Sequence, residues 1–167
     1  DPNANHIKAG LEKLEFLVVQ ELFLTETAQY ADVVLPGASF AEVDGTFTNT
    51  ERRVQRVRKA IEPLAGRNNW QPIMEISNRM GYQMNYNTTE EIFNEMASLT
   101  PSYQGMSYAR IDKEGLQWPC PTPDHPGTKY LHATAFTRGK GLFQGIDHVP
   151  PAELPDDQYP YLLSTGR

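Results

Sequence analysis

Two short apolar runs, separated by about a dozen residues, constrain the fold of this chain more than any other feature. Residues 16–19 read Phe-Leu-Val-Val, and residues 33–35 read Val-Val-Leu. Runs of this kind, without polar alternation, are typical of parallel strands that are covered on both faces. The connection between them, residues 20–32, is close to the shortest that can form a right-handed crossover. We therefore expect an α/β fold with a Rossmann-like parallel-sheet half-domain.

An acid stands directly after the first run, in the pair Gln20 and Glu21. At the carboxyl end of a buried parallel strand, an acid can accept hydrogen bonds from ribose hydroxyls or from the N1 and exocyclic amine of a guanine. A solvated turn acid is the alternative, and position alone favours it. No Gly-x-Gly-x-x-Gly sequence occurs nearby, so the phosphate-binding half of a dinucleotide fingerprint is missing. Thr25 is then expected to cap a helix of two turns over residues 26–31.

Three further segments carry apolar residues at helical spacing. They cover residues 7–15, residues 70–80 and residues 88–99, and the last of these begins with a capping box. The segment 51–61 alternates apolar and basic residues in a way that fits both an extended and a helical conformation.

From residue 101 onward the chain is rich in proline, because nine of its thirteen prolines lie there. Frequent Pro and Gly residues interrupt both helices and strands. We expect an irregular, Pro/Gly-rich C-terminal extension that follows the protein surface, with short strand-like pieces at residues 131–136 and 161–164. The chain begins with Asp1 and stops where a new apolar strand starts. Both ends indicate a fragment of a longer protein.

Composition narrows the classes of function. The net charge of −6 argues against a general nucleic-acid binder, which needs a surplus of Lys and Arg. No apolar run approaches the roughly 20 residues that span a bilayer, and the first ten residues lack the basic and apolar regions of a secretory signal. The single cysteine, Cys120, allows no intramolecular disulfide and no Cys-rich metal site within this chain, and it is expected to be a small packed residue. The composition is that of a cytoplasmic protein.

A cluster of basic residues could grip phosphates or an acidic partner; its members are Arg52, Arg53, Arg56, Arg58 and Lys59. More often such a cluster is a solvated face paired with neighbouring acids, here Glu51 and Glu62. The four histidines have no metal-like spacing, and no hydrolase, zinc or phosphate-loop motif occurs. We therefore expect no catalytic residue in this chain and no enzymatic activity from it alone.

The segment from residue 17 to residue 61 resembles a signature of the molybdopterin oxidoreductase superfamily. The resemblance rests on TETAQYADVVLP, on an acid followed by DGTFTN, and on ERRVQ. The fuller match, which includes NNWQPI, GMSYARI and GLQWPCP followed by HPGT, resembles the catalytic (α) subunit of molybdenum- or tungsten-dependent formate dehydrogenases.

This resemblance implies a fragment of a formate dehydrogenase subunit, an enzyme that oxidises formate to CO2 and passes electrons to an iron–sulfur cluster. Residues 1–100 would be part of an α/β domain that binds a molybdopterin guanine dinucleotide. Residues 101–160 would be an irregular connecting segment, and residues 161–167 the start of a truncated C-terminal β-barrel domain. The implied cofactors are a molybdenum (or tungsten) bis-molybdopterin guanine dinucleotide and a 4Fe-4S cluster, the cluster and the metal being held by parts of the subunit absent here.

The resemblance also assigns candidate cofactor-binding residues. Gln20 and Glu21 would contact the guanosine end of the dinucleotide. Asn69 takes the place of an acid that often precedes the tryptophan of the later helix. Arg167 ends a Thr-Gly-Arg that opens the cofactor-binding segment of the barrel in relatives, so it is expected to touch a cofactor in an intact protein. The implied partners are the remainder of the catalytic subunit and electron-transfer subunits. Two alternatives remain: another bis-cofactor oxidoreductase such as nitrate reductase, and a non-catalytic interaction module that uses the arginine-rich face.

Overall fold

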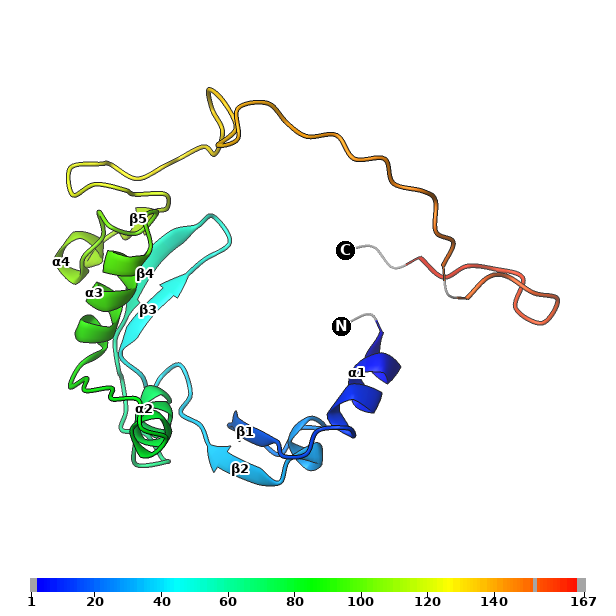
Figure 1. The fold of residues 1–167 in the computed structure, drawn as a ribbon, viewed down its shortest axis with the longest axis horizontal. Coiled ribbons are helices and arrows are strands. Elements are labelled where there is room, and N and C mark those ends of the chain that lie inside the picture. The colour runs from blue at the N-terminus through cyan, green and yellow to red at the C-terminus, as the bar shows by residue number, and fades with distance from the viewer. Residues whose placement is uncertain (1–2, 152, 165–167) are drawn as a thin grey trace. The chain divides into compact units, whose positions relative to one another are not determined.

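The two apolar runs form a parallel pair of strands, β1 (Val18–Glu21) and β2 (Val33–Pro36), as Figure 1 shows. The computed structural model describes residues 3–151 and 153–164. The register pairs Val18 with Val33 and Glu21 with Pro36, so both strands end at the same edge of the sheet. The predicted parallel unit is confirmed. Its first strand begins later than the apolar run and continues through Glu21, which brings the acid to the strand end.

The crossover between these strands holds a single 3-10 turn, η1 (Ala28–Tyr30). The prediction of two helical turns over residues 26–31 is wrong, since residues 26–27 form a turn and only Ala28–Tyr30 are helical. The N-cap residue of this turn is Thr27 instead of the predicted Thr25, although the Thr25 hydroxyl accepts a hydrogen bond from the Ala28 N–H at 3.3 Å. At the end of the crossover, Asp32 Oδ2 accepts a hydrogen bond from the Leu17 N–H at 2.7 Å. This contact joins the residue before β2 to the residue before β1.

The N-terminal helix α1 (Ala4–Leu11) lies earlier in the sequence than the predicted segment 7–15. It begins after Asn3, whose side chain accepts from the His6 N–H at 3.2 Å. No described residue of this helix is buried. It is therefore a surface element that the apolar spacing alone placed a few residues too late.

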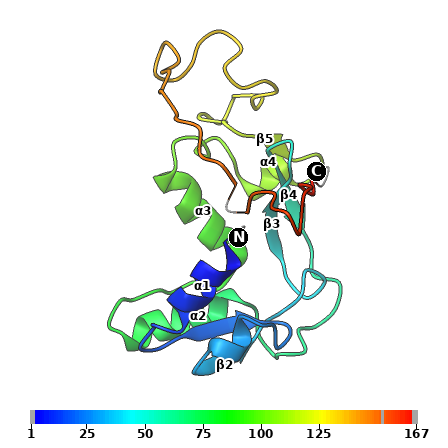
Figure 2. The same cartoon turned by 90° about the vertical axis from the view of Figure 1, so that its right-hand side faces the viewer.

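A second sheet contains the basic segment. Strands β3 (Gly45–Thr48) and β4 (Arg53–Val57) form an antiparallel hairpin, and β5 (Leu116–Gln117) pairs with the other side of β4 (Figures 1 and 2). The sequence left residues 51–61 ambiguous, and the structure makes their first part extended. Arg52 lies in the turn of the hairpin, directly before β4, and has a positive φ of 67°.

The core of residues 3–129 lies between this sheet and two helices, α3 (Thr89–Leu99) and the short α4 (Tyr108–Ile111). A further helix, α2 (Trp70–Arg79), contributes none of the residues of this buried cluster. The predicted capping box of α3 is confirmed by both of its hydrogen bonds. The buried cluster consists of Val54, Phe93, Ala97, Met106, Tyr108, Ile111 and Cys120. Helix α2 covers the predicted segment and ends before Gly81, which has a φ of 90°.

Four of the buried core residues come from the proline-rich part, which the sequence predicted to follow the surface. That description is wrong for residues 105–120. Gly105 permits the burial, since a Cβ there would lie 2.0 Å from the Thr122 carbonyl oxygen. Arg110 donates to the carbonyl oxygens of Gly105 and His125 and so holds the segment in place. Cys120 is fully buried, and the prediction of a small packed residue is confirmed.

Residues 130–164 belong to a second unit. Apart from residue 152, which is not described, this stretch contains no helix or strand, and its one bridge joins Phe136 to Gly139. The strand-like pieces predicted at residues 131–136 and 161–164 are therefore wrong. Their large side chains have no sheet to pack against, and Leu163 is 91% exposed. The described residues thus form a mixed α/β fold with one parallel and one antiparallel sheet. None of their helices is long and apolar enough to cross a membrane.

Candidate functional site

The carboxyl edge of the parallel pair forms a small cavity of about 220 Å³. Gln20 and Glu21, at the end of β1, line this cavity together with the next residue, Leu22. Gly37 and Ala38 follow β2, and Asn69 stands immediately before α2. Three of the four residues singled out from the sequence therefore line one cavity. The fourth, Arg167, lies outside the described residues.

Glu21 is held by the backbone around it. Its Oε1 accepts a hydrogen bond from the Leu22 N–H at 2.7 Å, and its carbonyl oxygen accepts from the Gly37 N–H at 3.0 Å. The two strand ends approach so closely that a Cβ on Gly37 would lie 3.2 Å from the Glu21 carbonyl carbon. Glycine is the residue that fits this approach. The second carboxylate oxygen of Glu21 has no hydrogen-bond partner among the described residues and is free to accept from a ligand.

Asn69 joins the two walls of the cavity. Its Oδ1 accepts from the Ala38 N–H at 2.7 Å, and its Nδ2 donates to the Ala38 carbonyl oxygen at 3.0 Å. The same Oδ1 accepts from Gln20 Nε2 at 3.4 Å. The sequence pointed to Asn69 as a ligand of the cofactor. In the structure most of its hydrogen-bonding capacity is used within the protein, between β1 and the loop after β2.

Glu42, a buried acid that the sequence did not single out as a site residue, holds the loop that follows β2 at the end farther from the strand. Its Oε2 accepts from the Ser39 N–H at 2.6 Å and its Oε1 from the Leu64 N–H at 2.8 Å. These backbone hydrogen bonds, above all the one from Ser39, lower the pKa of the Glu42 carboxyl. The spacing Ser39-x-x-Glu42 is that of a capping box, and it was the signal that could have revealed this role.

The chemistry of the cavity follows from its lining. Acceptor oxygens come from Glu21 and Gln20, and none of the six described residues that line the cavity is a Lys, Arg or His. Such a site suits a ligand edge made of N–H or O–H donors. A phosphate group would find no cation there to pair with. No group of three His, Cys, Asp or Glu among the residues described could hold a metal ion.

The basic cluster does not reach this cavity. Arg52 donates to the carbonyl oxygens of Trp118, Thr128 and Lys129, and its guanidinium lies 5.7 Å from the centre of the Trp118 ring. The other four side chains form ion pairs inside the chain, namely Arg53 with Glu51, Arg56 with Asp44, Arg58 with Asp112 and Lys59 with Glu62. These contacts support the structural interpretation of the cluster.

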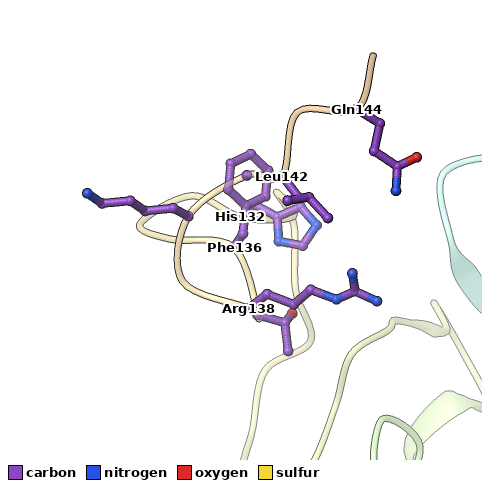
Figure 3. Close-up of a pocket in the computed structure, with 8 residues that line it drawn as sticks. His132, Phe136, Arg138, Leu142 and Gln144 are labelled. Atoms are coloured by element: carbon purple, nitrogen blue, oxygen red, sulfur yellow. The ribbon is translucent and has the colours of Figure 1, made fainter. Parts of the chain in front are cut away.

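A larger hollow of about 410 Å³ lies in the second unit and is drawn in Figure 3. One irregular loop forms it, with the His132 and Phe136 rings 5.1 Å apart and Arg138 and Gln144 on its rim. No helix or strand supports these walls, and Leu142 is 73% exposed. The smaller cavity at the strand ends is therefore the better candidate, because strands and a helix fix its shape.

Comparison with known proteins identifies the family. Residues 1–79, which include β1, β2 and Asn69, match the family model described as molybdopterin oxidoreductase. Through these residues, the chain belongs to the molybdopterin oxidoreductase family. The resemblance drawn from the sequence motifs is thereby confirmed.

Over its whole length this chain is 48% identical to the F420-dependent formate dehydrogenase subunit alpha of Methanocaldococcus jannaschii, and it covers 26% of that subunit. It is 41% identical over 99% of its length to the assimilatory nitrate reductase catalytic subunit of Bacillus subtilis, of which it covers 25%. The acetylene hydratase structure from Pelobacter acetylenicus is similar with a TM-score of 0.51 and 26% identity, over 68% of this chain and 16% of that one. The chain thus spans about a quarter of the length of the formate dehydrogenase and nitrate reductase subunits named here.

Proposed function

We propose that this chain is part of a formate dehydrogenase catalytic subunit and helps to bind the guanosine end of a molybdopterin guanine dinucleotide. The observation that carries the proposal is the free carboxylate oxygen of Glu21 in a cavity at the carboxyl end of a parallel strand. Open α/β sheets bind their ligands at this edge. The identity to a formate dehydrogenase α subunit over the whole chain supports the parent activity.

The donor set of guanosine fits the acceptors of the cavity. Guanine carries donors at N1 and at its exocyclic amine, and the ribose carries hydroxyl donors. Glu21 offers a carboxylate oxygen to these groups, and Gln20 adds an amide oxygen. Because no cationic side chain lines the cavity, the phosphates of the dinucleotide are expected to lie outside it.

The contribution of this chain is binding and orientation. The cofactor, when bound, would supply the chemistry itself, the two-electron oxidation of formate to CO2 and a proton, with a 4Fe-4S cluster of the parent subunit as the electron acceptor. Glu21 and Gln20 hold the nucleotide tail, and Asn69 and Glu42 hold the loop beside it. The remainder of the catalytic subunit and electron-transfer subunits are the expected partners.

A second candidate function is another bis-cofactor oxidoreductase, which the similarity to a nitrate reductase subunit favours. The test uses the complete subunit with its cofactor. We expect dye reduction that depends on formate, whereas turnover of nitrate without formate oxidation would select the alternative. The 167-residue chain alone is expected to be inactive, and formate turnover by that chain would contradict the proposal.

The binding role has its own test. Guanosine is titrated into the complete subunit purified without cofactor, and binding is followed by calorimetry. We expect saturable binding that weakens when Glu21 is neutralised. A cofactor-free subunit that does not bind guanosine would refute the assignment of the cavity.

A further inference from the structure

We propose that Asn69 is a positioning residue that determines ligand specificity, because it fixes which end of the Gln20 amide faces the cavity. This inference rests on the proposed guanosine site and deepens it. A chain of hydrogen bonds runs from the backbone of Ala38, whose polarity cannot change, through Asn69 to Gln20. Its consequence is a cavity that presents acceptors and rejects a ligand edge made of acceptors.

The backbone of Ala38 fixes the orientation of the Asn69 side chain. An N–H group requires an oxygen opposite it, and here Oδ1 lies 2.7 Å from the Ala38 nitrogen. A carbonyl oxygen requires a donor, and here Nδ2 lies 3.0 Å away. Turning the amide by 180° would lose both hydrogen bonds and would place like groups against each other at both contacts. Asn69 therefore has one favourable orientation.

Asn69 in turn fixes Gln20. Its Oδ1 can only accept, so the Gln20 atom that lies 3.4 Å away must be the Nε2 donor. The Gln20 Oε1 is then the end of the amide that remains for a ligand, and it has no hydrogen-bond partner among the described residues. Without Asn69, the amide of Gln20 could turn and present either a donor or an acceptor.

The hydrogen bonds that fix Gln20 through Asn69 act on specificity by rejecting the wrong ligand. Guanosine and isoguanosine are neutral isomers in which the amino and oxo groups of the purine are exchanged. A fixed Gln20 oxygen can accept from an amino group, whereas it repels an oxo group at the same place. Specificity of this kind comes from the repulsive contact as much as from the attractive one. Freeing Gln20 should therefore help isoguanosine more than it harms guanosine.

The loop should keep its place when Asn69 is removed. The Ser39 N–H remains bonded to Glu42, and the Gly37 N–H remains bonded to the Glu21 carbonyl oxygen. These contacts flank Ala38 on both sides and do not involve Asn69. A change in selectivity can therefore be separated from a collapse of the loop.

The experiment compares N69A with N69D in the complete subunit purified without cofactor, by calorimetric titration of guanosine and isoguanosine. The wild type is expected to bind guanosine about tenfold more tightly than isoguanosine, or more, because one repulsive contact weakens the binding of isoguanosine by about that factor. N69A is expected to reduce this preference to about threefold or less, mainly through tighter binding of isoguanosine. N69D still accepts from the Ala38 N–H and from Gln20. It is expected to keep the preference, although its carboxylate faces the Ala38 carbonyl oxygen and weakens binding of both nucleosides.

The double variant Q20E/N69A supplies a rescue, since a carboxylate at position 20 has no donor to turn toward the ligand. It should restore the preference for guanosine. If N69A does not fold by circular dichroism, N69S replaces it, because a hydroxyl can donate or accept and leaves Gln20 free. A wild type that prefers guanosine together with an N69A variant of unchanged preference would overturn this inference alone. A wild type that binds neither nucleoside would overturn the proposed function itself.

Discussion

Replacing Glu21 by glutamine isolates the charge of the proposed ligand contact from the fold around it. Glutamine keeps an Oε1 that can accept from the Leu22 N–H, now bonded at 2.7 Å, so the turn after β1 should persist. The free carboxylate oxygen becomes an NH2 group, which faces the donors of guanosine with another donor. The substitution therefore removes an acceptor at one defined atom.

The expected size of the effect follows from that single contact. A hydrogen bond to a charged group contributes about 1.5–3 kcal/mol, which corresponds to a loss of affinity of about 10- to 150-fold. Calorimetric titration of guanosine into the cofactor-free complete subunit measures it. The matched control is E26Q, which makes the same charge change at a side chain that is 86% exposed. E26Q should bind guanosine as the wild type does.

One result would refute the reasoning directly. If the wild type binds guanosine and E21Q binds it within about twofold, no charge-assisted hydrogen bond reaches Glu21. A parallel loss in E21Q and E26Q would instead indicate a long-range effect of net charge on binding.

The remaining predictions concern the loop and the core. G37A places a Cβ 3.2 Å from the Glu21 carbonyl carbon, so it should weaken guanosine binding several-fold in the same titration, and unchanged affinity would show that the close approach is not needed. Because backbone N–H groups lower the pKa of Glu42, its carboxylate stabilises the loop above the pKa of the unfolded chain, and this stabilisation is lost as pH falls through the folded pKa. Hydrogen-exchange protection of the Ser39 and Leu64 amides, corrected for the intrinsic pH dependence of exchange, should therefore fall on acidification in the wild type and show little further dependence on pH in E42Q. I111A removes a side chain that is 1% exposed and should lower the free energy of unfolding in urea by about 2–4 kcal/mol, whereas I73A, at a site 57% exposed, should cost much less.

The sequence predicted those elements whose signals are local. The parallel pair followed from two unbroken apolar runs, and the helix at residues 89–99 followed from its capping box. The placement of Gln20 and Glu21 at a strand end also followed, because side chains just after a buried strand lie at its carboxyl edge.

The features that sequence reasoning missed depend on contacts between distant residues. Burial of Met106 and Ile111 requires the close approach of Gly105 to Thr122, which no pattern of prolines and glycines reveals. The exposed segment 131–136 has strand-like residues, and without a neighbouring strand its backbone cannot form a ladder. The role of Asn69 needed the position of Ala38, 31 residues earlier in the chain.

The parallel pair β1 and β2 has a practical consequence for work on this protein. Among the described residues it is a sheet of only two strands, and Val18 and Val33 are 41% and 38% exposed. Free strand edges of this kind recruit strands from other molecules. The 167-residue chain, produced alone, should therefore self-associate as its concentration rises in a sedimentation experiment. Ligand titrations on that preparation would report the aggregate as well as the cavity, so binding is measured on the complete subunit.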